Sequence, residues 1–220
     1  MTLVTGLVLA AGSGRRMGTP KALLRDPDGT SWLLRSIAAV SGGGCRSVVV
    51  VLGAAGEAAA RLLEGEDVTA IRAKHWDQGM GASLREGLTY LLGTDTTVAL
   101  VTLVDLPDVG SDVVARIVAR ALARTADAAD TTDAADTLDA ADDAAGNLAD
   151  VLVRAAYRGV PGHPVAIGRA HWAEVISSAV GDRGARDYLS AHSVALVECA
   201  DLASGRDVDR PPVPGPTNET

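Results

Sequence analysis

Residues 7–21 of this 220-residue chain read LVLAAGSGRRMGTPK. The opening apolar run is typical of a buried strand, and a loop rich in glycine and basic residues follows it. Glycine lets backbone N–H groups approach a phosphate closely, arginine offers forked donors, and lysine adds a point charge. The residues concerned are Gly12, Gly14, Arg15, Arg16, Gly18 and Lys21. We therefore expect a strand that leads into an anion-binding loop suited to a triphosphate.

Familiar active-site loops do not fit this stretch. A P-loop places its lysine directly after the last glycine, whereas Thr19 and Pro20 separate Gly18 from Lys21. The dinucleotide-binding pattern GxGxxG fails because the third glycine comes one residue late. A serine-nucleophile elbow is excluded because Gly-x-Ser-x-Gly is absent. The loop is therefore a different kind of phosphate site, with a plain glycine turn carrying surface bases as the alternative.

Short apolar runs alternate with longer segments of helical period along the rest of the chain. This alternation is typical of βαβ units, and continuous apolar runs indicate strands that are covered on both faces. The strands are expected at residues 3–9, 47–52, 68–71, 98–104, 151–157 and 194–198, and the helices at 31–40, 56–63, 81–92, 111–123, 170–179 and 183–191. The expected fold class is a three-layer α/β sandwich around a mostly parallel, Rossmann-like sheet.

Composition and charge exclude several classes of protein. The chain has 20 basic and 28 acidic residues, a net charge of −8, and only 3% aromatic residues, which argues against a general nucleic-acid binder. No apolar run approaches the ~20 residues that cross a bilayer, and no secretory signal pattern follows Met1. Cys45 and Cys199 form no CxxC, which fits a reducing compartment. We expect a cytoplasmic protein without nucleic-acid or membrane partners.

One segment departs from the βαβ alternation. Residues 125–147 read TADAADTTDAADTLDAADDAAGN, with seven aspartates and no base in residues 127–143. A spacing of three drifts around a helix and leaves no apolar face to bury, and the spacing of a calcium loop is absent. We therefore expect a solvated, low-complexity insertion in a single domain of residues 1–210, followed by a disordered tail at 211–220. Without this insertion the net charge is about −1.

Asp105 is the first candidate metal ligand. It follows an apolar strand and so lies at the carboxyl edge of the sheet, where ligands of open α/β sheets bind. Mg²⁺ prefers one or two carboxylates together with phosphate oxygens and water, and Asp207 or Asp209 would supply the second carboxylate. The alternative for Asp105 is a cap of the following turn, and for the other two aspartates an ordinary surface role.

Two further residues are candidates for substrate contacts. His163 lies between Gly162 and Pro164 in what we expect to be a rigid turn, where it either hydrogen-bonds an acceptor substrate or holds the turn. Ser83 begins a helix after a glycine-rich stretch, so free N–H groups there could meet a phosphate, with a plain helix start as the alternative. The other histidines show no metal-ligand spacing.

At these motifs the chain resembles the MobA-like nucleotidyltransferases, and within them the molybdenum cofactor cytidylyltransferases. The family signature LAAGxSxRMGxxK matches LAAGSGRRMGTPK at 9–21 nearly throughout. Further matching segments, in the family's order, are GMGASL at 79–84, DLP at 105–107, GHP at 162–164, DRGAR at 182–186 and DVDRP at 207–211. Two departures are the insertion at 125–147 and the Arg210-Pro-Pro sequence, which replaces the usual Thr-Pro-acid after Asp209.

The resemblance implies a nucleotide-diphospho-sugar transferase-like fold and a Mg²⁺-dependent nucleotidyltransferase. Such an enzyme joins a nucleoside monophosphate from CTP or GTP to the phosphate of molybdopterin or molybdenum cofactor and releases pyrophosphate. CTP leads because Ala11 stands where guanylyl members have glycine. The residues implied are Arg16, Lys21 and Asp105 for catalysis, Asp105 and Asp209 for Mg²⁺, and His163 for the acceptor. Those implied for the nucleotide are Leu9, Ala10, Ala11, Gly12, Ser13, Gly14, Arg15, Lys21, Gly53 and Ser83.

Two alternatives remain open. A sugar-phosphate or other small-phosphate nucleotidyltransferase would share the first loop, although the GHP segment and the compact length argue against it. A non-catalytic accessory protein would keep the loop and hold molybdenum cofactor for insertion into a molybdoenzyme, and Arg210 beside Asp209 leaves that reading open. A molybdoenzyme or its chaperone is the macromolecular partner that the resemblance implies.

Overall fold

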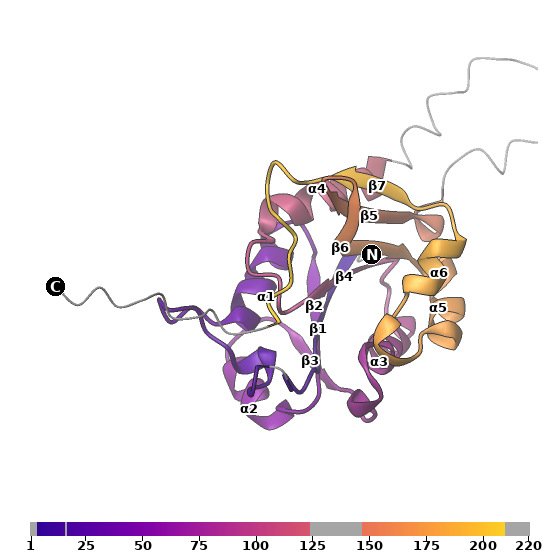
Figure 1. Ribbon diagram of the computed structural model, residues 1–220. Helices are drawn as coiled ribbons and strands as arrows, with labels where there is room; N and C mark the ends of the chain where they lie inside the picture. The colour runs from indigo at the N-terminus through magenta and orange to yellow at the C-terminus, as the bar shows by residue number, and fades with distance from the viewer. Residues whose placement is uncertain (1–3, 16, 124–146, 210–220) are drawn as a thin grey trace, which may run out of the picture.

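The fold is organised around one seven-stranded sheet. The structure, a computed structural model, describes residues 4–15, 17–123 and 147–209. The strand order is β3-β2-β1-β4-β6-β5-β7, as Figure 1 shows. The strands are β1 (Val4–Ala10), β2 (Ser47–Leu52), β3 (Thr69–Arg72), β4 (Val98–Leu103), β5 (Leu152–Tyr157), β6 (Val160–Gly168) and β7 (Ala195–Glu198). All the described pairings are parallel except those of β6, so the expected mostly parallel sheet is confirmed.

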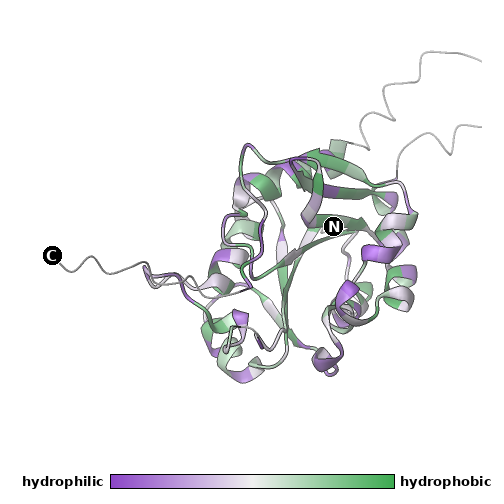
Figure 2. Cartoon of the chain, viewed as in Figure 1, coloured by the Kyte–Doolittle hydropathy of each residue, from purple (hydrophilic) through white to green (hydrophobic). Residues whose placement is uncertain are grey.

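Helices cover both faces of the sheet and complete three layers. One face carries α1 (Trp32–Gly42), α2 (Gly56–Leu62) and α4 (Ser111–Ala123), and the other carries α3 (Met80–Leu92), α5 (Trp172–Ser178) and α6 (Arg186–Ala191) (Figure 1). Strand β1 is buried along its whole length, with Val8 and Leu7 in opposite apolar clusters. The central strands are correspondingly apolar in Figure 2, which is why they read as continuous runs in the sequence.

The packing of α1 against β1 has a local cause. A Cβ at Gly6 would lie 1.9 Å from Val40 Cγ1, so only glycine at this position allows the helix to sit so close to the strand. The helix begins where the Ser31 hydroxyl accepts a hydrogen bond from the Leu34 N–H at 3.5 Å, a typical N-cap contact. Gly6 and the Ser31 cap therefore fix the position of α1 against β1, the strand that leads into the glycine-rich loop.

One strand differs from the sequence-based expectation. Residues 162–164, expected as a turn, lie inside β6, and the peptide bond between His163 and Pro164 is cis. The prolines and Gly162 concealed the strand, because such residues usually mark turns in a sequence. The reversal occurs earlier, at Arg158 and Gly159, both of which have positive φ. The strand is tolerated because its regular pairing with β4 begins only at Val165.

The last two helices are shorter than expected. A 3₁₀ turn at Arg169–His171 precedes α5, and another at Gly181–Arg183 precedes α6. Gly184, with φ +54°, separates the second turn from α6. The expected insertion at 125–147 lies outside the described residues except for Asn147, and the expected tail at 211–220 lies wholly outside them. Within the part that the structure describes, no helix has the length and apolar character needed to span a membrane.

Candidate active site

The glycine-rich loop leaves the carboxyl end of β1. Gly14 has φ +62°, and a Cβ there would lie 1.8 Å from the carbonyl oxygen of Thr19, so this position requires glycine. The loop closes on itself where the Met17 N–H donates to the Gly14 carbonyl at 2.8 Å. A Cβ at Gly12 would meet open space, and Arg15 is exposed. Arg16 lies outside the described residues. The loop therefore presents backbone and a cationic side chain to solvent, as expected for an anion site.

The residues that flank this loop are packed more tightly. Leu9, Ala10 and Ala11 are buried, so the chain can offer a nucleotide their backbone but little of their side chains. Ala54 N–H donates to the Ala11 carbonyl at 3.2 Å, and a Cβ at Gly53 would lie 2.4 Å from that oxygen. Gly53 is therefore needed to bring the end of β2 against the start of the loop. A base contact of Gly53 stays a prediction.

Ser83 lies in the first turn of α3 and is 3% exposed. Gly79, the residue directly before this helix, has φ +101°, and a Cβ added there would lie 2.6 Å from Asp182 Oδ1. This close approach brings the Gly181–Arg183 turn against the beginning of α3. The serine hydroxyl is thus covered in this arrangement, and its nucleotide contact stays a prediction.

Lys21 lies between two carboxylates. Its Nζ donates to Asp105 Oδ2 at 2.5 Å and to Asp209 Oδ1 at 2.7 Å. Burial lowers the pKa of Lys21, but the hydrogen bonds to both aspartates and their negative charges together outweigh that effect and raise the pKa above its ordinary value. The sequence predicts a contact of Lys21 with a triphosphate, which stays a prediction; in the structure its ammonium group lies between the two aspartates expected as metal ligands.

The acidic cluster contains the expected metal ligands and the third aspartate that the sequence left open. One carboxylate oxygen from each of Asp105, Asp207 and Asp209 lies within 4.8 Å of the others. The Val208 N–H donates to the Asp105 carbonyl at 3.0 Å, which holds the last described segment against the end of β4. Asp105 Oδ1 is buried and has no hydrogen-bond partner among the described residues. These oxygen ligands suit a hard divalent cation.

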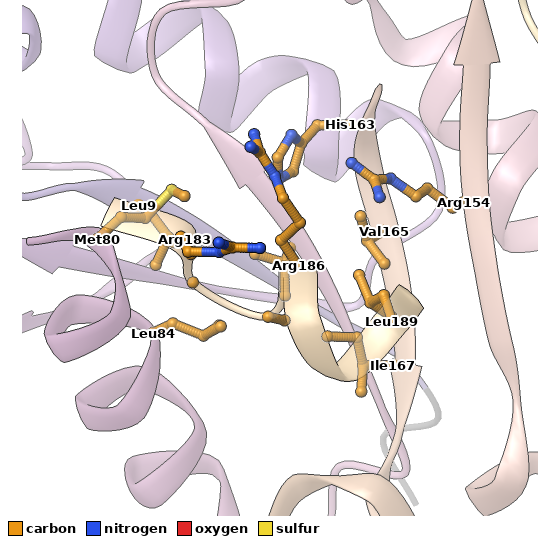
Figure 3. Close-up of a pocket in the computed structure, with 13 residues that line it drawn as sticks. Leu9, Met80, Leu84, Arg154, His163, Val165, Ile167, Arg183, Arg186 and Leu189 are labelled. Carbon is orange, nitrogen blue, oxygen red and sulfur yellow. The ribbon is translucent and has the colours of Figure 1, made fainter. Parts of the chain in front are cut away.

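A second group of charged residues lines a pocket on the α3–α6 face of the sheet. Three arginines and His163 surround it, and Figure 3 shows His163, Arg154 and Arg186 directed into the same space. The pocket is lined by Leu9, Met80, Leu84, Val101, Arg154, His163, Val165, Ile167, Arg183, Gly184, Ala185, Arg186 and Leu189. The lining contains no acidic residue, so it suits an anionic ligand with an apolar body.

The three arginines of this pocket, Arg154, Arg183 and Arg186, are not among the sequence-predicted site residues. Arg154 interrupts the otherwise apolar strand β5, and that interruption is the signal that could have revealed it. Its Nε donates to the Gly162 carbonyl at 2.8 Å, which aims the guanidinium toward β6. Burial lowers the pKa of Arg154, and the charge of Arg186 acts in the same direction. Arg183 differs, because it is paired with Asp187.

His163 is held in this pocket as a neutral group. Burial lowers its pKa to about 4, and the charges of Arg154 and Arg186 contribute in the same direction. Its carbonyl accepts a hydrogen bond from the Tyr157 hydroxyl at 2.7 Å. His163 therefore lies in strand β6 and not in the expected turn. Its imidazole lines the arginine-rich pocket, which suits an anionic ligand.

The acidic cluster and the arginine-lined pocket share one edge of the sheet. Asp105 follows β4 at its carboxyl end, and Val165 of the antiparallel β6 pairs with Val101 of β4. His163 precedes Val165 by two residues and therefore lies toward the same edge. Leu9, just before the glycine-rich loop, contributes to the pocket wall. The three predicted elements, the loop, the carboxylate and the histidine, thus lie toward the same edge of the sheet.

A cationic glycine loop and clustered carboxylates at the carboxyl edge of a mostly parallel sheet place this chain among the ligand-binding open-sheet α/β proteins. The chain belongs to the MobA-like NTP transferase family, whose domain model matches residues 6–196. It is 34% identical to a protein named nicotine blue oxidoreductase, from Paenarthrobacter nicotinovorans, over 94% of this chain and 92% of that protein. The resemblance noted from the motifs is confirmed at the level of the family.

Solved structures share the same architecture. Rv0371c from Mycobacterium tuberculosis H37Rv has a TM-score of 0.69 at 24% identity, covering 95% of this chain and 94% of that chain. Its complex with manganese has a TM-score of 0.62 at 25% identity, covering 90% and 89%. Molybdopterin-guanine dinucleotide biosynthesis protein A from Archaeoglobus fulgidus has a TM-score of 0.63 at 17% identity, covering 94% and 93%. The expected nucleotide-diphospho-sugar transferase-like fold is confirmed.

Proposed function

We propose that this protein transfers a nucleoside monophosphate from CTP to the phosphate of a molybdopterin-type acceptor and releases pyrophosphate, with Mg²⁺ held by Asp105 and Asp209. The observation that carries the proposal is the arrangement of two oppositely charged sites on one sheet edge. The acidic cluster suits a metal–triphosphate complex, and the arginine-lined pocket suits an anionic acceptor with an apolar body. GTP is the alternative nucleotide.

The chemistry needs positioning and charge neutralisation more than a covalent intermediate. An oxygen of the acceptor phosphate bonds to the α-phosphorus, while the bond from that phosphorus to the bridging oxygen breaks and its electron pair leaves with pyrophosphate. The acceptor phosphate is largely ionised at neutral pH, so its oxygen needs no general base. Bound Mg²⁺ would neutralise phosphate charge and polarise the α-phosphate.

The chain's own residues divide the remaining work. Arg15 and the backbone N–H groups of the glycine loop would hold the triphosphate, together with Arg16 and Lys21. Arg154 and Arg186 would bind the acceptor phosphate, and neutral His163 would offer a hydrogen bond without adding a charge. Support for a divalent metal comes from the orphaned Asp105 Oδ1 and from the manganese complex of Rv0371c.

The test is pyrophosphate release with Mg²⁺ and molybdopterin, measured with CTP and separately with GTP. Turnover with CTP, and less with GTP, is the expected result, and omission of the acceptor should abolish it. If molybdopterin binds but neither nucleotide turns over, the protein is an accessory binding protein and the enzyme proposal fails. If only a sugar phosphate supports release, the acceptor assignment fails while the transferase assignment stands.

A redox function is the second candidate, because the relative from Paenarthrobacter nicotinovorans is named an oxidoreductase. Cys45 and Cys199 are both buried free thiols, so such a reaction would need an added redox group. The discriminating assay offers the protein a hydride-donating dinucleotide together with nicotine blue, the compound in that relative's name. Dye reduction without any pyrophosphate release in the first assay would favour the redox function.

A further inference from the structure

Lys21 pairs with the same two carboxylates that the proposed metal would bind. Its ammonium bonds to both Asp105 and Asp209, and these are the carboxylates assigned to Mg²⁺. A divalent cation bound to the same two groups would lie close to that ammonium, and like charges at such a distance repel strongly in a partly buried site. The lysine and the metal therefore compete for this pair of aspartates.

The surroundings allow the lysine to leave. Its side chain is 16% exposed, whereas that of Asp209 is 43% exposed, so the ion pair opens to solvent on the Asp209 side. Lysine is a point charge on a flexible four-carbon stem and can turn without a change of backbone. The glycine-rich loop immediately precedes it in the chain, so a bound triphosphate would offer anionic oxygens nearby.

We propose that Lys21 is a resident counter-ion of the acidic cluster, which a metal–triphosphate complex displaces. The cation takes over the oxygens of Asp105 and Asp209, and the phosphates receive the ammonium that the carboxylates release. Metal alone then binds weakly, because the displaced ammonium has no new anionic partner. When a triphosphate supplies that partner, metal and nucleotide bind together. This inference rests on the proposed metal site and adds the order in which its components assemble.

The experiment measures Mn²⁺ binding by calorimetry, without nucleotide or acceptor, in three proteins. Lys21→Met should bind Mn²⁺ at least about tenfold more tightly than the wild type. In this variant the metal no longer has to break a charged hydrogen bond, and the loss of one such bond typically changes an affinity by about tenfold or more. Arg206→Met removes an exposed positive charge next to Asp207 in the chain, and it should change affinity by about threefold or less. Lys21→Arg, which keeps the charge, should stay near the wild-type value.

A second measurement covers the case in which Lys21→Met does not fold, because that change leaves a buried carboxylate without its partner. Lys21→Gln keeps a donor toward Asp105, and the same gain in Mn²⁺ affinity is expected. Thermal unfolding supplies the companion readout: Mn²⁺ alone should raise the Tm of Lys21→Gln more than the Tm of the wild type.

The outcomes separate this inference from the proposed function. Equal Mn²⁺ affinity in the wild type and the Lys21→Met or Lys21→Gln variant would overturn the counter-ion role and leave the metal site intact. An equal gain in Arg206→Met would overturn it too, because any nearby charge would then suffice. Absence of Mn²⁺ binding in every protein, even with CTP present, would remove the metal site itself and the inference with it.

Discussion

The acidic cluster and the arginine-lined pocket differ in whether their charged groups already have partners of opposite charge within the site. In the cluster, Lys21 already pairs with Asp105 and Asp209 inside the protein. In the pocket, Arg154 and Arg186 face neutral His163, and no acidic residue lines the cavity. The first site must therefore exchange an internal partner for its ligand, whereas the second is open to an anion. Under the proposed function, this difference means that metal and nucleotide would bind together, whereas the acceptor site would be preformed.

Loss of Asp105 should have the largest effect. Asp105→Asn keeps the volume but removes a proposed metal ligand, so turnover should fall by at least about a thousandfold, given that a bound metal contributes several kcal/mol to such reactions. The measurement is pyrophosphate release at saturating CTP, Mg²⁺ and acceptor. Asp95→Asn, an exposed aspartate outside both sites, is the matched control. Near-normal turnover of the Asp105 variant in a folded protein would remove this residue from the site and break the comparison.

Loss of Arg186 should act on one substrate only. Arg186→Met removes a charged donor from the open pocket, so the KM for the acceptor should rise about 10- to 100-fold while the KM for CTP stays unchanged. Arg183→Met should have a smaller effect, because Arg183 already has Asp187 as a partner. The measurement is steady-state kinetics with each substrate varied in turn. A rise in the KM for CTP instead would show that the pocket belongs to the nucleotide.

The neutral state of His163 should appear in the pH dependence of stability. The folded protein protonates His163 only near pH 4, whereas an ordinary histidine protonates near 6.5. Between these values the unfolded state binds more protons, so this group makes the free energy of unfolding fall as the pH drops from 6.5 to about 4. His163→Gln cannot titrate, and its urea-unfolding free energy should depend less steeply on pH across that window.

The control for this measurement is His75→Gln, because His75 is exposed. Its dependence on pH should follow that of the wild type. Equal slopes for the wild type and His163→Gln would mean that the imidazole titrates normally and that the pocket carries more positive charge at low pH than the comparison assumes.

The smallest effect is expected from removal of the aspartate-rich segment. Deletion of residues 127–143 removes seven aspartates and no base. Because the sequence there has no apolar face to pack, kcat and both KM values should stay within about twofold of the wild type. Steady-state kinetics with CTP and the acceptor provide the check. A large loss would show that the two sites alone do not account for activity.

Local sequence was sufficient to predict much of this architecture. Strands β1, β2 and β4 are buried on both faces, and so their apolar runs were visible without tertiary information. Strand β6 was missed because Pro161 and Pro164 look like turn residues, although the strand is held through its pairing with β4 and β5. Local propensity therefore failed where long-range pairing decides the conformation.

The candidate site shows the same division. The sequence alone determined the glycine-rich loop and the position of Asp105 after a strand, because both depend on short-range backbone geometry. The tertiary structure alone decided that Lys21 meets Asp105 and Asp209, which are separated from it by 84 and 188 residues. It also decided that three arginines converge beside His163. Such contacts follow from the order of strands in the sheet and from chain closure over long distances, which no local pattern of residues records.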